Sequence, residues 1–151
     1  MTESLIRNFG KLYINGMGAL RVFFKSTGHP NAIIYNASPG TLQIDDDVTL
    51  DAEQKVGYTY GYAVFNQSGT STLNGGTYIC DNLSGGAETV GVVNVSAGTV
   101  NISGSEYYSA NPKETAIGLM IDSGANVTIT GGTFKGIKLP DCLDRYSRRN
   151  N

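Results

Sequence analysis

Three consecutive aspartates, Asp45, Asp46 and Asp47, are the densest group of side chains in the sequence that could bind a metal or take part in catalysis. Carboxylate oxygens are the ligands that Ca²⁺ prefers, and this ion takes about six to eight oxygens. A pair of carboxylates from neighbouring segments could instead act on a polysaccharide as general acid and base. A charged run in a turn can also simply face solvent. We favour the solvated turn and keep a calcium site and a catalytic group as alternatives.

A tyrosine-rich segment, VGYTYGY, is the second candidate site and contains Tyr58, Tyr60 and Tyr62. Alternate side chains of an extended strand share a face, so the three phenol rings would lie on one side of the segment. Aligned aromatic rings can stack on the apolar faces of sugar rings. The alternative is that these rings cover or line the core of the protein. We keep the three tyrosines as a candidate ligand-binding set for a glycan.

The remaining residues that could carry chemistry lack partners in the sequence. His29 is the single histidine and lies in a turn, GHPN, whereas a general base needs a partner. Cys80 and Cys142 are 62 positions apart and show no paired spacing, which argues against a zinc site or a disulfide framework. The sequence therefore predicts no catalytic residue and no cofactor, and a calcium site and a catalytic group at the aspartate run stay as the alternatives.

The elements that must position these candidates repeat along the chain. Five segments each contain a glycine, then alternating apolar residues, then a turn. The last apolar residue before each turn recurs at steps of 30, 29, 29 and 27 residues, at Ile14, Ile44, Leu73, Ile102 and Ile129. A second marker recurs at steps of 28, 30, 28 and 28 residues, at Asn8, Asn36, Asn66, Asn94 and Asp122. Two series with nearly the same period indicate stacked repeats.

Each repeat alternates apolar and polar residues with a period of two, which predicts two or three short strands. One repeat cannot bury its apolar face alone, so successive repeats must stack in register as parallel sheets. The sequence therefore predicts an all-β fold, a single-stranded right-handed parallel β-helix (β-solenoid) of about five coils of 27–30 residues. We assign residues 1–138 to this β-helix domain and residues 139–151 to a basic C-terminal tail.

Equivalent positions of stacked coils should lie directly above one another. The apolar markers should form one inward stack, beside a second stack made of Leu12, Leu42, Val100 and Val127, in which Ser71 is the weak position. An aromatic stack is expected on another face from Tyr78, Tyr107 and Phe134. The asparagine marker should form a ladder of hydrogen-bonded amides that Asp122 ends.

The same register bears on catalysis by the aspartate run. Asp45 aligns with Asn15 and Asn74, and Asp46 aligns with Gly16 and Gly75. The adjacent coils therefore offer no second carboxylate at this corner, which favours a protein without enzymatic activity.

Two segments, NQSGTSTLNGGTY and DSGANVTITGGTF, resemble repeats of bacterial right-handed parallel β-helix proteins of the pectin-lyase-like kind. Such folds occur in surface adhesins and phage tail spikes, and some relatives are polysaccharide lyases or hydrolases. The resemblance covers about residues 5–138 and implies the fold far more specifically than a function. It also implies an N-terminal capping helix, for which only residues 2–8 are available. Open ends of a solenoid are edge strands, which invite stacking.

Composition limits the partners. The formal net charge is −2, and the basic residues cluster only at the C-terminus, so no nucleic-acid partner is predicted. No apolar run reaches the roughly 18 residues that a membrane span requires. The N-terminus does not have the pattern of a signal peptide, so we expect either a protein made without Sec export or a piece of a longer protein. We favour a location at the cell surface, in the extracellular space or on a phage particle.

The sequence as a whole favours a non-enzymatic structural or binding β-helix segment of a cell-surface or phage-particle protein, in contact with glycans or a host surface. One alternative is a polysaccharide lyase or hydrolase, or an inactive remnant of one. The other is a self-stacking structural unit that forms homo-oligomers end to end.

Overall fold

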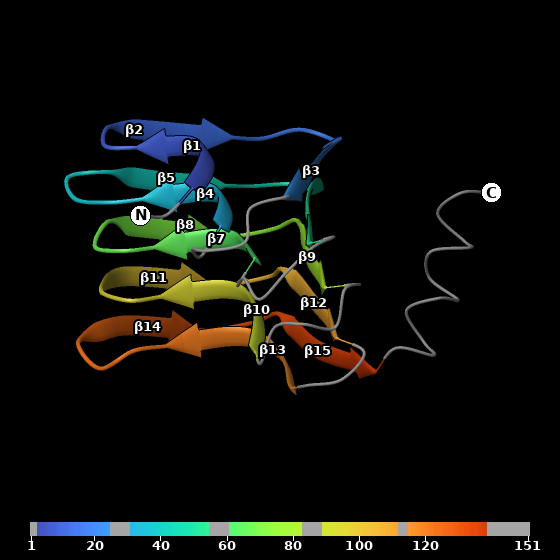
Figure 1. The fold of residues 1–151 in the computed structure, drawn as a ribbon. Coiled ribbons are helices and arrows are strands. Elements are labelled where there is room, and N and C mark those ends of the chain that lie inside the picture. The colour runs from blue at the N-terminus through green and yellow to red at the C-terminus, as the bar shows by residue number, and fades with distance from the viewer. Residues whose placement is uncertain (1–2, 25–30, 55–60, 83–88, 112–114, 139–151) are drawn as a thin grey trace.

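The computed structural model describes residues 3–24, 31–54, 61–82, 89–111 and 115–138, which form fifteen β-strands in three parallel five-stranded sheets (Figure 1). Sheet A contains β1 (Glu3–Asn8), β4 (Asn31–Asn36), β7 (Gly61–Asn66), β10 (Thr89–Val95) and β13 (Thr115–Ile121). Sheet B contains β2 (Lys11–Ile14), β5 (Thr41–Ile44), β8 (Thr70–Leu73), β11 (Gly98–Ile102) and β14 (Ala125–Ile129). Sheet C contains β3 (Gly18–Phe24), β6 (Val48–Gln54), β9 (Thr77–Asn82), β12 (Glu106–Asn111) and β15 (Thr133–Lys138). The predicted all-β parallel β-solenoid is confirmed.

Three consecutive strands, one from each sheet, make one rung of the solenoid. The first rung is β1–β3 and the last is β13–β15. Each strand pairs with the strand three places further along the chain, as β1 does with β4, so the rungs stack along one axis (Figure 1). Parallel strands lie about 4.8 Å apart. Positions one repeat apart in the sequence are therefore direct neighbours in space.

The inward stack of apolar markers is confirmed by the pairing of sheet B. Ile14 pairs with Ile44, Ile44 with Leu73, Leu73 with Ile102, and Ile102 with Ile129. In β5 the buried residues Leu42 and Ile44 alternate with the exposed residues Thr41 and Gln43. This alternation is the physical reason for the strand: each rung contributes one apolar face to a continuous core.

The second predicted stack also forms, and its polar member is fully satisfied. Leu42 pairs with Leu12 and with Ser71. The buried hydroxyl of Ser71 donates to Asn66 Oδ1 at 2.7 Å and accepts from Asn36 Nδ2 at 3.0 Å. Serine therefore stands in this apolar row because it connects the core to the neighbouring asparagines.

Sheet C places the predicted aromatic stack inside the core. Tyr78 and Tyr107 stack with ring centroids 4.9 Å apart and an angle of 11° between the rings. Tyr107 and Phe134 stack at 4.6 Å and 5°. Burial raises the pKa of both tyrosine hydroxyls well above the ordinary value, so these phenols stay neutral. The Tyr78 hydroxyl donates to Gly75 O at 2.9 Å, which fixes the ring at the corner between sheets B and C.

The asparagine ladder forms over the first three rungs, at the corner between sheets A and B. Asn8 Nδ2 donates to Asn36 Oδ1, and Asn36 Nδ2 donates to Asn66 Oδ1, both at 2.9 Å. Glycines make room for these amides, since a Cβ atom on Gly40 or Gly69 would lie 2.6 Å from the amide of Asn36. The ladder ends where Asn66 Nδ2 donates to the backbone oxygens of Gly69 and Ala97, at 2.9 and 2.8 Å.

The prediction that Asn94 and Asp122 continue the ladder is wrong. Val95 pairs with Asn66 and takes the ladder position in the fourth rung, and Ile121 pairs with Val95 in the fifth. The segment from Asn94 to the next glycine, NVSAG, is as long as NASPG at Asn36 and one residue longer than NQSG at Asn66. The additional residue lies in the turn at Asn36 but in the strand at Asn94, where Val95 pairs with Asn66, so Asn94 takes the preceding position and points away from the ladder.

We expect the two kinds of asparagine to differ in their contribution to stability. Asn36→Ala removes an amide with four side-chain hydrogen bonds and leaves buried partners unsatisfied, so it should lower the free energy of unfolding by about 2–3 kcal/mol. Asn94→Ala removes a buried Oδ1 atom that has no hydrogen-bond partner, and it should cost about 1 kcal/mol or less. Urea unfolding measures both variants. Equal losses would show that the ladder does not distinguish these residues.

Candidate functional site

The tyrosine set predicted from the sequence lies only partly within the described residues. Tyr58 and Tyr60 lie outside them. Tyr62 lies in β7 and is only 3% exposed, with its ring stacked on Phe65 at a centroid distance of 5.7 Å and an angle of 17°. The ring of Tyr62 therefore supports a neighbouring aromatic side chain and does not itself present an open face.

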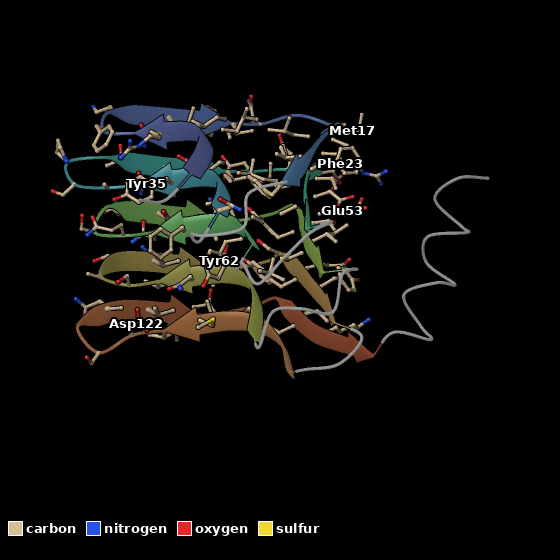
Figure 2. The ribbon with its side chains drawn as sticks, in the orientation of Figure 1. Met17, Phe23, Tyr35, Glu53, Tyr62 and Asp122 are labelled. Carbon is tan, nitrogen blue, oxygen red and sulfur yellow. The ribbon has the colours of Figure 1, made fainter. Side chains whose placement is uncertain are left out.

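The neighbour belongs to a row of aromatic side chains, Phe9, Tyr35 and Phe65, that follows sheet A across the first three rungs. We call this set the aromatic row. Ring centroids are 6.4 Å apart between Phe9 and Tyr35 and 5.6 Å apart between Tyr35 and Phe65. Tyr35 pairs with Phe65 in the sheet, and both are half-buried, while Phe9 is 52% exposed. Figure 2 shows Tyr35 and Tyr62 on neighbouring strands of this sheet.

Arg7 joins the aromatic row by cation–π contacts. Its guanidinium carbon lies 5.6 Å from the ring centroid of Phe9 and 5.2 Å from that of Tyr35. Such contacts stabilise a cation at the protein surface by about 0.5–1 kcal/mol. The ion pair within the described ranges joins Arg21 and Asp51 at 2.9 Å and does not include Arg7. The aromatic row thus combines partly exposed aromatic rings with the positive charge of Arg7. The Arg7 guanidinium forms no ion pair with a carboxylate of the described residues.

The aromatic row was missed in the sequence because its members are about thirty residues apart. A signal was present nevertheless: Arg7, Tyr35 and Phe65 each stand directly before a ladder asparagine. Any position next to a ladder residue must form a second row on the opposite side of the sheet, because side chains alternate along a strand. Three large side chains at such positions predict an outward-facing row.

The aspartate run lies at the corner between sheets B and C. There the side chains of Asp45 and Asp46 accept hydrogen bonds from other residues of the protein. Asp45 Oδ1 accepts from Asn74 Nδ2 at 2.7 Å, and its Oδ2 accepts from Gln43 Nε2 at 2.8 Å. Asp46 has a φ of 63° and its Oδ2 accepts from Gly16 N at 3.3 Å. Within the described ranges, no group of three or more His, Cys, Asp or Glu side chains is arranged to hold a metal ion. Calcium binding by Asp45, Asp46 and Asp47 therefore stays a prediction, and no group of metal ligands among the described residues supports it.

A hollow of about 580 Å³ lies beside this corner, and carboxylates from different rungs line it. Asp46 and Asp47 line it from the second rung and Glu106 from the fourth, together with Asn74 and Thr77. The prediction of no second carboxylate at this corner considered only adjacent coils. Glu106 comes from a rung two places away, and its Oε2 accepts from the Tyr108 hydroxyl at 2.7 Å.

No protein-family model, no curated protein and no solved structure matches the chain. The β-solenoid architecture itself rests on the strand pairing described above. The described part of the chain contains no helix with the length and apolar character needed to cross a membrane.

Hydrogen bonds lower the pKa of the Asp45 carboxyl group, with Asn74 as the largest cause, followed by Tyr13 and Gln43. A lowered folded-state pKa stabilises the fold at pH values above the ordinary aspartate pKa, and this contribution is lost as the pH falls through the lowered value. Asn74→Ala should therefore raise the pKa of Asp45 toward the ordinary value. An NMR titration of the side-chain carboxyl groups measures the pKa of Asp45 in the variant and in the unchanged protein.

Ser103→Ala is the matched control for this titration. The Ser103 hydroxyl donates to Asn74 Oδ1 at 2.9 Å, on the side of the amide away from Asp45. This variant should leave the Asp45 titration nearly unchanged. An Asp45 pKa that stays low in Asn74→Ala would contradict the assignment of its cause.

Proposed function

We propose that the protein is a non-enzymatic β-solenoid of a cell-surface or phage-particle protein, and that it holds a glycan chain against the aromatic row. The observation that carries this proposal is the succession of Phe9, Tyr35 and Phe65 in three consecutive rungs, with Arg7 over two of the rings.

The geometry of the aromatic row suits a linear, repetitive ligand. Successive rings follow the stacking direction of the rungs, so an extended chain could contact several of them at once. The C–H faces of sugar rings are apolar and pack on aromatic faces, while their hydroxyl groups remain in water. Tyr35 adds a phenol group, and Arg7 adds N–H donors, for hydrogen bonds with those hydroxyl groups.

The solenoid also fixes the rings before a ligand arrives. Phe65 is held between Tyr35 and the buried Tyr62, at centroid distances of 5.6 and 5.7 Å. The strands beneath are tied to the ladder through Asn36 and Asn66. A site that is already ordered loses little conformational entropy on binding, which favours affinity from a small contact area.

Binding to a glycan array tests the proposal. Tyr35→Ala and Phe9→Ala should each weaken binding by roughly tenfold or more, because an aromatic anchor at the centre of a contact contributes about 1–3 kcal/mol. Thr72→Ala is the matched control, since Thr72 lies on sheet B away from the aromatic row. Far-UV circular dichroism and thermal unfolding confirm that each variant is folded. Absence of binding to every glycan, or equal affinity of all variants, would refute the proposal.

Polysaccharide cleavage at the hollow is the second candidate function. The observation in its favour is that Asp46, Asp47 and Glu106 line one cavity, because paired carboxylates are what glycoside hydrolysis requires. If this candidate holds, release of reducing ends should be lost in Asp47→Asn and in Glu106→Gln and kept in Tyr35→Phe. Our leading proposal instead expects bound glycan to stay intact during prolonged incubation.

A further inference from the structure

The two ends of the solenoid carry all the large hydrophobic side chains that are exposed among the described residues. The first rung and its turns contribute Leu5, Phe9, Tyr13, Met17 and Phe23. The last rung contributes Ile121, Ile129 and Phe134. Position within a stack is what matters: Ile129 is 48% exposed, whereas its equivalents Ile44, Leu73 and Ile102 are at most 1% exposed. In the first rung the core residues Leu12, Ile14 and Leu20 are only half-buried, whereas their equivalents in the second rung are at most 2% exposed. The apolar rows of the core are therefore incompletely covered at both ends.

Backbone hydrogen bonding is open at the same places. In each sheet the first-rung strand, β1, β2 or β3, pairs on one side only, and so does the last-rung strand, β13, β14 or β15. Among the described residues, no helix lies over either end. An unpaired parallel edge with apolar side chains is a template for another strand of the same kind.

The two ends are complementary in register. If a last rung is followed by a first rung, each inward row of the core continues with another apolar residue. The rows of sheets A, B and C would continue from Leu119 to Ile6, from Val127 to Leu12, from Ile129 to Ile14 and from Phe134 to Leu20. The rings and branched chains at these positions match in kind those that pack between rungs within the molecule.

Charge is complementary at the corner between sheets A and B. Asp122 follows β13 at an exposed position, and its backbone N–H donates to Val95 O, as Ala37 N–H does to Asn8 O. It therefore occupies the position of Phe9 in the first rung. A following copy would place its Phe9 next to Asp122, and the Arg7 guanidinium lies over the Phe9 ring. Asp122 (labelled in Figure 2) would then stand beside the pair of Phe9 and Arg7, whose guanidinium lies over Phe9 and Tyr35 and forms no ion pair with a carboxylate of the described residues.

One pair of like charges also meets in this arrangement. Lys135 continues the row that begins with Arg21, so the two cations would become neighbours. Arg21 is already paired with Asp51 at 2.9 Å, and the Lys135 ammonium lies over the Tyr108 ring at 5.4 Å. Both charges are thus partly compensated within one molecule, and the same joint brings four apolar rows together.

We propose that the end of the last rung binds the first rung of a second copy of this chain, head to tail, with parallel strand pairing and an Asp122–Arg7 ion pair between copies. Such an interface joins two different surfaces, so it leaves one free end of each kind and extends to filaments. Each end of the solenoid thus binds another copy of the chain, and the strands of the two copies pair in the same register as the strands of successive rungs.

Charge reversal tests this interface, in the full chain and without any glycan present. Sedimentation velocity and electron microscopy should show assembly that increases with protein concentration. Asp122→Arg and Arg7→Glu should each weaken association by about tenfold, and the double variant should recover much of it, because the pair is re-formed with opposite polarity. Gln67→Arg, which adds a positive charge at the equivalent corner of the third rung, should associate like the unchanged protein.

Three results would overturn the proposal. The first is a strictly monomeric protein at all concentrations. The second is assembly that neither single variant weakens, and the third is a two-fold symmetric dimer with like ends joined. Asp122 and Arg7 are exposed, so both variants should fold, and circular dichroism verifies this. Glycan binding through Tyr35 by a monomer would leave the proposed function standing and remove this interface alone.

Discussion

The register between rungs is the constraint on which the rest of the structure depends. A strand of four to seven residues has no stability by itself, and each rung here is completed only by hydrogen bonds and buried side chains of its neighbours. The buried asparagines make the register specific. Asn36 bonds to Asn8 and Asn66 and to Ser71 of the next rung, so a slip by one residue would leave several buried polar atoms unsatisfied. Apolar rows alone would tolerate such a slip more readily.

This constraint explains which features could be predicted from the sequence. The rows through Ile44 and Tyr78 could be predicted because each position is buried against its equivalents, so selection by packing keeps the residue type similar. The ladder could be predicted only up to Asn66. NVSAG at Asn94 has the same length as NASPG at Asn36, but its additional residue lies in the strand and not in the turn, which reverses the side to which Asn94 points. A period counted in residues cannot show on which side of a turn an insertion is absorbed.

The candidate site was harder to predict than the fold for a related reason. Function on a solenoid comes from residues that are distant in the sequence, such as Tyr35 and Phe65, or Asp47 and Glu106, whereas local motifs attract notice first. The alternation around Tyr62 showed that the tyrosine segment has two faces but not which of them is buried. Burial is decided by the neighbouring rungs, and in this case they place Tyr62 against Phe65.

The two proposals are connected by the same register. In a head-to-tail stack, the position before the ladder would pass from Met120 of one copy to Arg7 of the next, so the aromatic row would recur once per copy along one side of the filament. A long glycan could then contact several rows, and linked weak contacts gain affinity without any new interaction. Open ends are an aggregation hazard for an isolated solenoid. In an assembly that presents repeated glycan sites, the same open ends would set their spacing and alignment.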